Sequence, residues 1–156
     1  MSDLQFAVSA SSESPARVRV ATRQFTMTID EPPELGGQDQ GANPVEYLLA
    51  ALAGCLNVVA HLVAREQGIA LRGLTVNASG EVNPDRLLNV PTTDRAGFKG
   101  IRVELGVDTD ASPEALAQWR QVVESRCPVS DNLNQPTPVT IEVVHRPKSV
   151  KEGGLP

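Results

Sequence analysis

Residues 43–68, NPVEYLLAALAGCLNVVAHLVAREQG, form the longest apolar stretch of the chain and decide its fold. Asn43 and Glu46 have the spacing of a capping box, in which each side chain bonds the backbone N–H of the other residue. Pro44 suits the first helical position, and Gly68 suits the position just after a helix ends. We therefore predict a helix that begins after Asn43 and runs to about residue 67.

This predicted helix is apolar on nearly every side from Val45 to Ala64, a pattern that predicts burial all round. Its length would also suit a membrane span. Polar groups are costly in lipid, however, and three polar residues interrupt the stretch. The remaining segments are amphipathic, so the sequence favours the central helix of a soluble protein. The interrupting residues are Glu46, Asn57 and His61.

The residues before the helix alternate between polar and apolar side chains, as strands do. We expect an edge strand at Leu4–Ser9 and a hairpin formed by Arg17–Ala21 and Arg23–Asp30. Glu31–Ala42 contains two prolines and three glycines, which predicts a loop.

Further strands and a second helix are predicted after residue 68. Leu71–Val82 and Gly97–Val107 have strand patterns, with a polar loop at Asn83–Arg95 between them. Ser112–Arg126 has a helix start and an apolar stripe, and Pro138–His145 has the pattern of a last strand. Three strands, a long helix, two strands, a helix and a strand indicate an α+β fold with an antiparallel sheet.

Composition indicates a single globular domain over residues 1–156, with a flexible tail at 148–156. Apolar residues make up 40% and charged residues 21% of the chain. The net charge of −5 argues against nucleic acid as a partner, because phosphate binding needs a basic surface. Residues 1–10 lack the pattern of a signal peptide, and no basic amphipathic helix suggests a membrane surface. We therefore expect a cytoplasmic protein.

The long helix also predicts a homodimer. One sheet and one further helix cannot cover an all-round apolar helix, and a second copy related by a twofold axis would cover the remainder. Small residues on the helix permit such close approach; the alternative is a monomer whose loops close over it. These small residues are Ala50, Ala51, Ala53, Gly54 and Ala60.

Two cysteines, Cys55 and Cys127, are the first candidates for chemistry. Each has an ordinary structural interpretation, as a small buried apolar residue or as a turn residue before proline. A redox pair is the functional alternative. A zinc site is disfavoured, because these cysteines and the only histidines, His61 and His145, lack the short spacing of zinc ligands. No Gly-x-Ser-x-Gly or phosphate-binding loop is present.

The combination of two motifs resembles the OsmC/Ohr family of two-cysteine proteins. Gly36-Gly37 followed by residues 41–55, GANPVEYLLAALAGC, looks like the central-helix motif of that family. Cys127-Pro128-Val129 looks like its second motif. The resemblance extends from about Arg17 to His145.

This resemblance implies an OsmC-like fold, an intertwined homodimer and active sites at the subunit interface. In peroxidase members, the helix cysteine, here Cys55, attacks an organic hydroperoxide and becomes a sulfenic acid. The second cysteine, here Cys127, then closes a disulfide that a dithiol reductant reopens. No metal or bound organic cofactor is needed.

The supporting residues are less well matched. Peroxidase members have a glutamate where this chain has Val45, and Glu46 lies about 180° around the helix from Cys55. Glu46 is therefore either a catalytic carboxylate or a helix cap. The family also uses an arginine from the N-terminal strands, and Arg19 is our choice because it is central in a clear strand. The mismatch at Val45 motivates a second hypothesis, a non-enzymatic OsmC-like protein that binds a small molecule or senses redox state in the interface pocket.

Arg17 and Arg23 are the other candidates for this arginine. An adjacent cation lowers the pKa of a thiol and so increases its reactive fraction. On this reading the candidate catalytic residues are Cys55, Cys127, Arg19 and Glu46.

Overall fold

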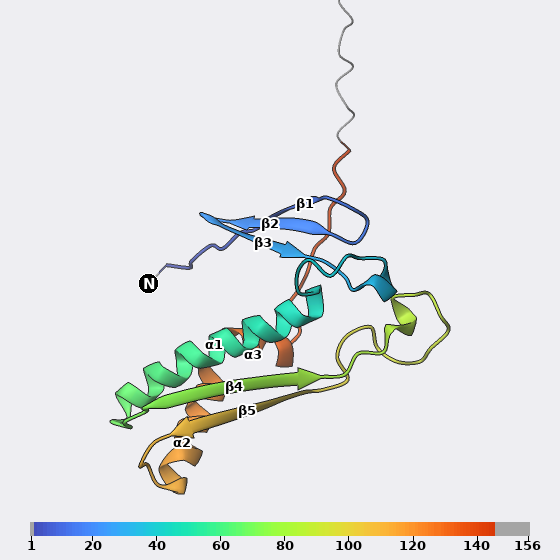
Figure 1. Cartoon of the computed structure of the whole chain (residues 1–156). Helices are drawn as coiled ribbons and strands as arrows, with labels where there is room; N and C mark the ends of the chain where they lie inside the picture. The colour runs from blue at the N-terminus through green and yellow to red at the C-terminus, as the bar shows by residue number, and fades with distance from the viewer. Residues whose placement is uncertain (1, 146–156) are drawn as a thin grey trace, which may run out of the picture.

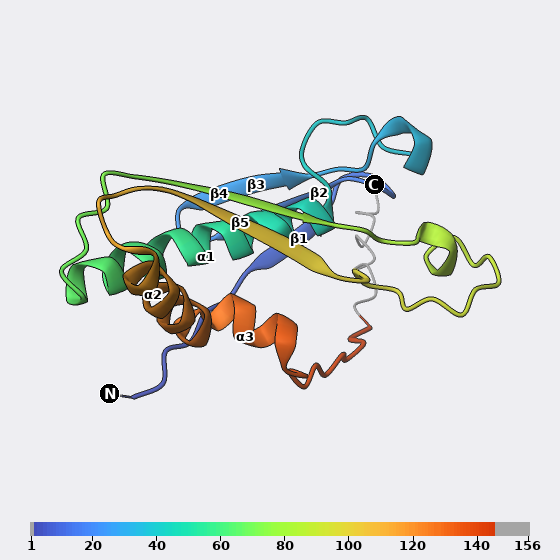
Figure 2. The same cartoon turned by 90° about the horizontal axis from the view of Figure 1, so that it is seen from below.

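The computed structural model describes residues 2–145, so the predicted flexible tail lies outside the described residues. Figure 1 shows a long helix, α1 (Pro44–Glu66), with a three-stranded sheet near its N-terminal end and a long two-stranded sheet alongside it. Figure 2 shows two shorter helices, α2 (Pro113–Arg126) and α3 (Pro128–Asn134), at the side of α1 away from the N-terminal sheet. The fold is α+β with antiparallel strands, as predicted, although the strands form two separate sheets.

The N-terminal sheet contains β1 (Ser9–Ser12), β2 (Val18–Thr22) and β3 (Phe25–Ile29), paired in that order. The predicted hairpin is confirmed, with Thr22 opposite Phe25. The predicted edge strand is displaced, because β1 begins at Ser9 and pairs there with Ala21. Continuing the register places Val8 opposite Thr22, the last residue of β2, so β2 offers no backbone to the residues before Val8.

The loop at residues 31–42 folds around the buried carboxylate of Asp30. That carboxylate accepts backbone N–H groups from Glu31, Gln38 and Gln40 at 3.0, 3.1 and 3.2 Å. Gly37 packs so closely on Glu31 that an added Cβ would overlap the Glu31 carbonyl oxygen. A single turn of 3-10 helix, η1 (Pro33–Leu35), forms part of this loop.

Helix α1 (Pro44–Glu66) has the predicted start. Asn43 accepts the Glu46 N–H at 2.9 Å, and the Glu46 carboxylate accepts the Asn43 N–H at 2.8 Å. The Tyr47 hydroxyl donates to the Thr28 carbonyl oxygen at 3.0 Å, which ties the helix start to β3. Gly68 follows the helix with a left-handed φ of 68°, as expected after a helix end.

The second sheet pairs β4 (Gly73–Gly80) with β5 (Ile101–Asp108) along their whole length. The long loop between them contains one 3-10 turn, η2 (Pro84–Arg86). Strand β4 lies within the predicted range 71–82, and β5 begins within the predicted range 97–107 and ends one residue beyond it. Helix α1 packs against β4 on one side and against α2 and α3 on another.

Two short helices follow β5. Helix α2 (Pro113–Arg126) begins at the N-cap Ser112, as the sequence predicts, and α3 (Pro128–Asn134) was not predicted. Cys127 ends α2 with an extended backbone and also caps α3, because its sulfur accepts the Ser130 N–H at 3.4 Å. The turn expected from Cys127-Pro128 is therefore a junction between two helices.

The predicted last strand, Pro138–His145, is not formed in the single chain. Its apolar side chains are 69–94% exposed, and no strand among residues 2–145 pairs with it. Alternating polar and apolar residues indicate that a segment prefers a sheet, but a strand forms only where the edge of another strand is free to pair with it. The exposed apolar residues are Val139, Ile141, Val143 and Val144.

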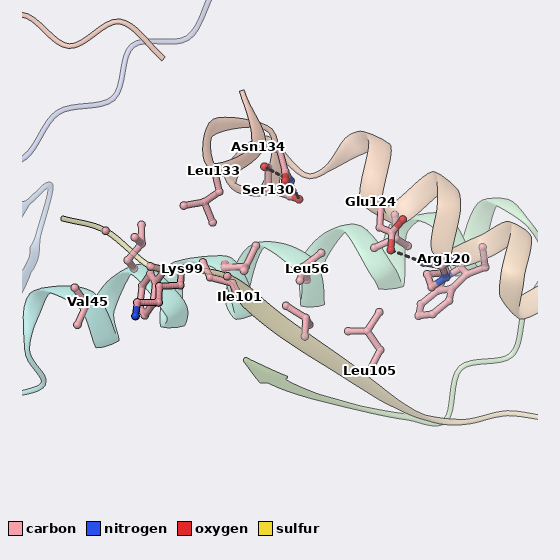
Figure 3. A pocket seen from close by; sticks show the side chains of 18 of the residues that line it. Val45, Leu56, Lys99, Ile101, Leu105, Arg120, Glu124, Ser130, Leu133 and Asn134 are labelled. Atoms are coloured by element: carbon pink, nitrogen blue, oxygen red, sulfur yellow. Dashed lines mark hydrogen bonds and ion pairs between the residues drawn. The ribbon is translucent and has the colours of Figure 1, made fainter. Parts of the chain in front are cut away.

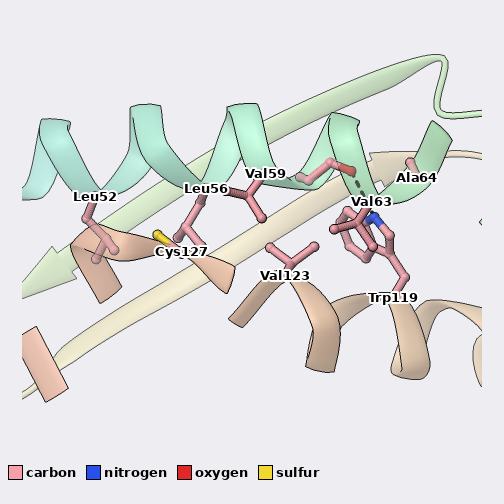
Figure 4. Close-up of a cluster of buried hydrophobic side chains, with 9 residues drawn as sticks. Leu52, Leu56, Val59, Val63, Ala64, Trp119, Val123 and Cys127 are labelled. Carbon is pink, nitrogen blue, oxygen red and sulfur yellow. Dashed lines mark hydrogen bonds between the residues drawn. The ribbon is translucent and has the colours of Figure 1, made fainter. Parts of the chain in front are cut away.

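The core lies between α1 and α2, as Figure 4 shows. The prediction that α1 is buried all round is wrong for one chain, because β4 and the two short helices leave one face uncovered. The exposed face carries one large apolar residue, Val58, which is 65% exposed. The other residues of this face are small or polar: Ala50, Ala51, Gly54, Asn57 and His61. Helix α1 is long and apolar enough to cross a bilayer, but core helices of soluble proteins share this property, and nothing else in the described residues indicates a membrane protein.

Candidate functional site

The sulfur atoms of Cys55 and Cys127 lie 2.9 Å apart. Cys55 lies in the middle of α1 and is half-buried, whereas Cys127 lies at the α2–α3 junction and is 1% exposed. Pro128 disfavours helical backbone at the residue before it, so α2 ends at Arg126 and Cys127 is extended. Of the four residues proposed from the sequence for catalysis, the single chain brings together the two cysteines.

The electrostatic surroundings of Cys55 do not favour its thiolate. Burial raises the pKa of the Cys55 thiol, and the neighbouring Cys127 thiol adds to this rise. The Val129 backbone N–H at the start of α3 lowers the pKa of Cys55 and is outweighed. No cation from residues 2–145 contributes to the shift. A single chain therefore holds Cys55 mainly as a thiol.

An apolar groove of about 840 Å³ lies between α1, β5 and the two short helices (Figure 3). Val45 and Lys99 lie near one end and Arg120 and Glu124 near the other. Leu56, the residue after Cys55, and Ser130, whose N–H bonds the Cys127 sulfur, line the groove, so the cysteine pair lies next to this wall although neither cysteine is among the described lining residues. The other apolar lining residues are Leu48, Phe98, Ile101, Val103, Leu105, Val107, Leu116, Trp119, Val123 and Leu133.

The three candidate arginines lie in or beside the N-terminal sheet. Arg17 is 23% exposed and bonds Glu13, Gln38 and Gln40. Arg19 is 60% exposed and pairs with Glu13 at 2.6 Å. Arg23 occupies the hairpin turn with its guanidinium 5.1 Å from the Phe25 ring centre. Arg17 is thus the most firmly held of the three, and none of them reaches Cys55 in its own chain.

Glu46 and Val45 occupy the start of α1. Both hydrogen bonds of the capping box are formed. The Glu46 carboxylate therefore accepts the Asn43 N–H rather than a hydrogen bond from either cysteine. Val45 lines the groove, at the position where a glutamate would face the same space. The position at which this chain differs from the peroxidase pattern, Val45, therefore lies on the groove wall.

The histidines do not join the cysteines. His61 is on the exposed face of α1, and His145 is exposed near the end of the described chain. Among residues 2–145, no three His, Cys, Asp or Glu side chains are grouped so that they could hold a metal ion.

Sequence reasoning missed the contribution of α3. Its first turn places the Val129 and Ser130 N–H groups beside the two sulfurs, and Ser130 and Leu133 line the groove. Proline at the first helical position and Asp131 in the first turn were signals for this helix. Cysteine is an uncommon N-cap, which is why the pattern was interpreted as a turn.

Comparisons with known proteins agree with this geometry. The family model described as OsmC-like protein matches residues 37–142, and no curated protein matches the sequence. An OsmC-like protein from Mycoplasma pneumoniae superposes with a TM-score of 0.73 at 23% identity, covering 85% of this chain and 89% of the other. An organic hydroperoxide resistance protein from Elizabethkingia anophelis has a TM-score of 0.64 at 20% identity, with 86% and 91% covered.

A third solved structure is an organic hydroperoxide resistance protein from Legionella pneumophila. Its TM-score is 0.61 at 20% identity, with 85% of this chain and 91% of the other covered. These structural likenesses describe the fold, while the sequence match spans both cysteines and most of the described residues. The chain belongs to the OsmC family.

Proposed function

We propose that this protein is a thiol-dependent peroxidase that reduces organic hydroperoxides in defence against oxidative stress. The observation that supports this most strongly is the 2.9 Å separation of the two sulfurs beside an apolar groove. The pair could form a disulfide with little movement, and the groove offers an apolar surface to an organic substrate. The names of the Elizabethkingia and Legionella proteins point in the same direction.

The proposed reaction has two steps. The Cys55 thiolate attacks the terminal peroxide oxygen, the O–O bond breaks, and the alkoxide leaves and takes up a proton to become an alcohol. Cys55 is then a sulfenic acid. The Cys127 sulfur attacks the Cys55 sulfur, the S–S bond forms, and the S–O bond breaks to release hydroxide, which becomes water on protonation. A dithiol reductant returns two electrons by opening the disulfide.

We also propose that the working protein is a homodimer. The exposed small-residue face of α1 and the uncovered apolar segment 138–145 support this, because each would be covered by a second copy. The electrostatics of Cys55 support it as well, since no cation of its own chain lowers the thiol pKa. An arginine of the partner's N-terminal sheet, such as the partner's Arg17 or Arg19, would supply that charge.

The remaining parts of the proposal follow from composition and chemistry. A net charge of −5 disfavours nucleic acid as a partner. Two cysteines held close together without a disulfide framework suit the reducing cytoplasm, where a dithiol reductant is available. The two-step reaction uses neither a metal nor an organic cofactor, and no membrane partner is proposed.

The direct test is a stopped-flow reaction of the reduced protein with cumene hydroperoxide, with thiols counted before and after. We expect loss of both thiols within seconds and a Cys55–Cys127 disulfide in the peptide map. Two thiols that remain free after minutes would contradict the peroxidase proposal.

A second candidate is a small-molecule binding or redox-sensing protein that uses the same groove without turnover. Two observations favour it: burial raises the pKa of Cys55, and Val45 stands on the groove wall where peroxidase members have a carboxylate. Titration of the Cys55 thiolate in the purified protein separates the two functions. A pKa well below about 8.5 supports the peroxidase, and a higher pKa supports the binding protein.

A further inference from the structure

Three buried residues, Trp119 and Val123 of α2 and Cys127 just after its end, pack toward α1 (Figure 4). Each is at most 3% exposed. Because a helix turns once in 3.6 residues, Trp119 and Val123 share one face of α2, and Cys127 follows at the end of that face. Trp119 therefore lies at one end of the contact with α1 and Cys127 lies at the other end.

The Trp119 end of this contact carries a buried, directional bond. The indole N–H donates to the Ala60 carbonyl oxygen of α1 at 3.0 Å (Figure 4). A carbonyl has two lone pairs, so Ala60 can accept this bond in addition to its helical one. A buried indole N–H without a partner would be costly, which makes this position of α2 along α1 favourable over neighbouring positions.

Apolar packing alone would restrict the position of α2 along α1 less, because burial of apolar surface is not directional. The side chains around these residues are mostly aliphatic, with Val123 between the two ends and Leu56 of α1 beside Cys127 (Figure 4). A second link, between Arg126 and Glu66, is half-exposed and therefore contributes less. The indole bond is thus the buried directional bond between α2 and α1, and the Val129 N–H adds a further bond to the Cys55 sulfur from the start of α3.

We propose that Trp119 is a positioning residue for disulfide formation: its bond to Ala60 sets α2 along α1 so that the Cys127 sulfur faces the Cys55 sulfur. This inference deepens the proposed function and rests on it. The sulfurs must approach from 2.9 Å to bonding distance, so a small displacement of α2 changes how often they meet. Trp119 acts on that probability and does not itself touch the reacting sulfurs.

The inference is tested by measuring the effective concentration of the Cys55–Cys127 pair against glutathione. In this exchange the S–S bond of oxidised glutathione breaks to give two glutathione thiols. The protein disulfide forms as its two thiols lose two electrons and two protons. A residue that only stabilised the fold would lower the stability of the reduced and oxidised proteins alike and leave this ratio unchanged.

Two variants remove the indole N–H. Trp119→Phe keeps an aromatic ring, and replacement of Trp119, the only tryptophan, by benzothienylalanine keeps the bicyclic shape. We expect the effective concentration to fall about fivefold in both, the worth of one net hydrogen bond. The matched control is Tyr47→Phe, which removes one hydroxyl bond to the Thr28 carbonyl oxygen at the start of α1, away from α2, and should leave the ratio at the parent value.

The sulfenic acid gives a second readout. When Cys55 is oxidised by cumene hydroperoxide in the presence of dimedone, the sulfenic acid partitions between the disulfide and the dimedone adduct. We expect more adduct in the two Trp119 variants than in the parent and the Tyr47→Phe control.

The outcomes separate this inference from the proposed function. A glutathione ratio within about twofold of the parent in folded benzothienylalanine protein would overturn the role of Trp119, even if Trp119→Phe failed to fold. A parent protein that does not react with cumene hydroperoxide would overturn the peroxidase proposal instead. The glutathione measurement would still decide the positioning role in that case.

Discussion

The Cys127 sulfur lies 2.9 Å from the Cys55 sulfur, although 72 residues of sequence separate the two cysteines. The contact joins the middle of α1 to the α2–α3 junction, across the centre of the core. It therefore connects the proposed chemistry to the stability of the whole fold.

Replacement of each cysteine should have a different effect on hydroperoxide consumption. We expect Cys55→Ser to abolish consumption, because the attacking sulfur is lost. Cys127→Ser should still react once, but Cys55 should then over-oxidise to sulfinic acid because no second sulfur traps the sulfenic acid. Mass spectrometry of the intact protein after cumene hydroperoxide distinguishes these products. Equal consumption in both variants and the parent would exclude the two-cysteine mechanism.

Oxidation of the pair should stabilise the protein against unfolding. A crosslink that closes a loop of 72 residues reduces the entropy of the unfolded chain and contributes about 4 kcal/mol on the chain-entropy model. Urea unfolding of the oxidised and reduced protein at matched concentration measures the difference. The Cys127→Ser variant is the control and should respond little to reductant.

A carboxylate at position 45 should activate Cys55 through the arginine that we propose the partner supplies, because ten residues of α1, about 15 Å, separate position 45 from Cys55. Val45 lines the groove in the first turn of α1, where the helix dipole favours a negative charge. We expect Val45→Glu to raise the rate constant for cumene hydroperoxide by about 100-fold, the lower end of what a positioned acid–base group contributes. Val45→Gln introduces a side chain of the size of glutamate without its charge, and it should leave the rate constant near that of the parent. A charge effect is refuted if both variants change the rate equally.

Segment 138–145 should contribute to dimer formation. Ile141 is 86% exposed in the single chain, and burial of such a side chain contributes about 2 kcal/mol. Ile141→Asp should therefore weaken self-association at least roughly 30-fold, as measured by analytical ultracentrifugation. Thr140→Asp, which changes the alternate side of the same segment, is the control. A parent protein that sediments as a monomer at all concentrations would argue against the dimer itself.

Asp30 should make the fold sensitive to acid. Burial raises its pKa, but the N–H groups of Gln40, Gln38 and Glu31 outweigh that effect, and the pKa lies below the ordinary value of 3.8. A carboxylate with a lowered pKa stabilises the folded state above the unfolded pKa, and this contribution is lost as pH falls through the folded pKa. We expect the free energy of unfolding to decline below pH 3.8 in the parent.

The matching variant is Asp30→Asn, which removes the titrating group. It should be less stable than the parent at pH 7 and should show a smaller decline in acid, by chemical unfolding at each pH. A parallel decline in both proteins would assign the acid sensitivity to other carboxylates.

Local signals in the sequence were sufficient for much of the fold. The start of α1 was predictable because Asn43, Pro44 and Glu46 interact with backbone groups a few residues away. The hairpin at Thr22 and Phe25 was predictable for the same reason. Such features depend on neighbours in sequence, and so a single sequence contains them.

Features that depend on distant partners were harder to predict. The alternation of polar and apolar residues in 138–145 did not show that the single chain has no free strand edge for this segment. The apolar side chains all round α1 did not show which face of the helix stays exposed. The proximity of Cys55 and Cys127 came from the family resemblance rather than from spacing. The contributions of Trp119 and Asp30 could not be deduced, because each depends on the position of a backbone group that only the fold provides.

The loop around Asp30 has a consequence for how this sequence can vary. Asp30 is bound by the backbone N–H groups of Gln38 and Gln40, which any residue except proline would offer. Among residues 2–145, their side chains bond only Arg17 and each other, so many replacements should preserve the loop. Gly37 has no such freedom, since even alanine would overlap the Glu31 carbonyl. In a library of random variants, the tolerance of substitutions would therefore change abruptly from one residue to the next, although the whole loop lacks regular secondary structure.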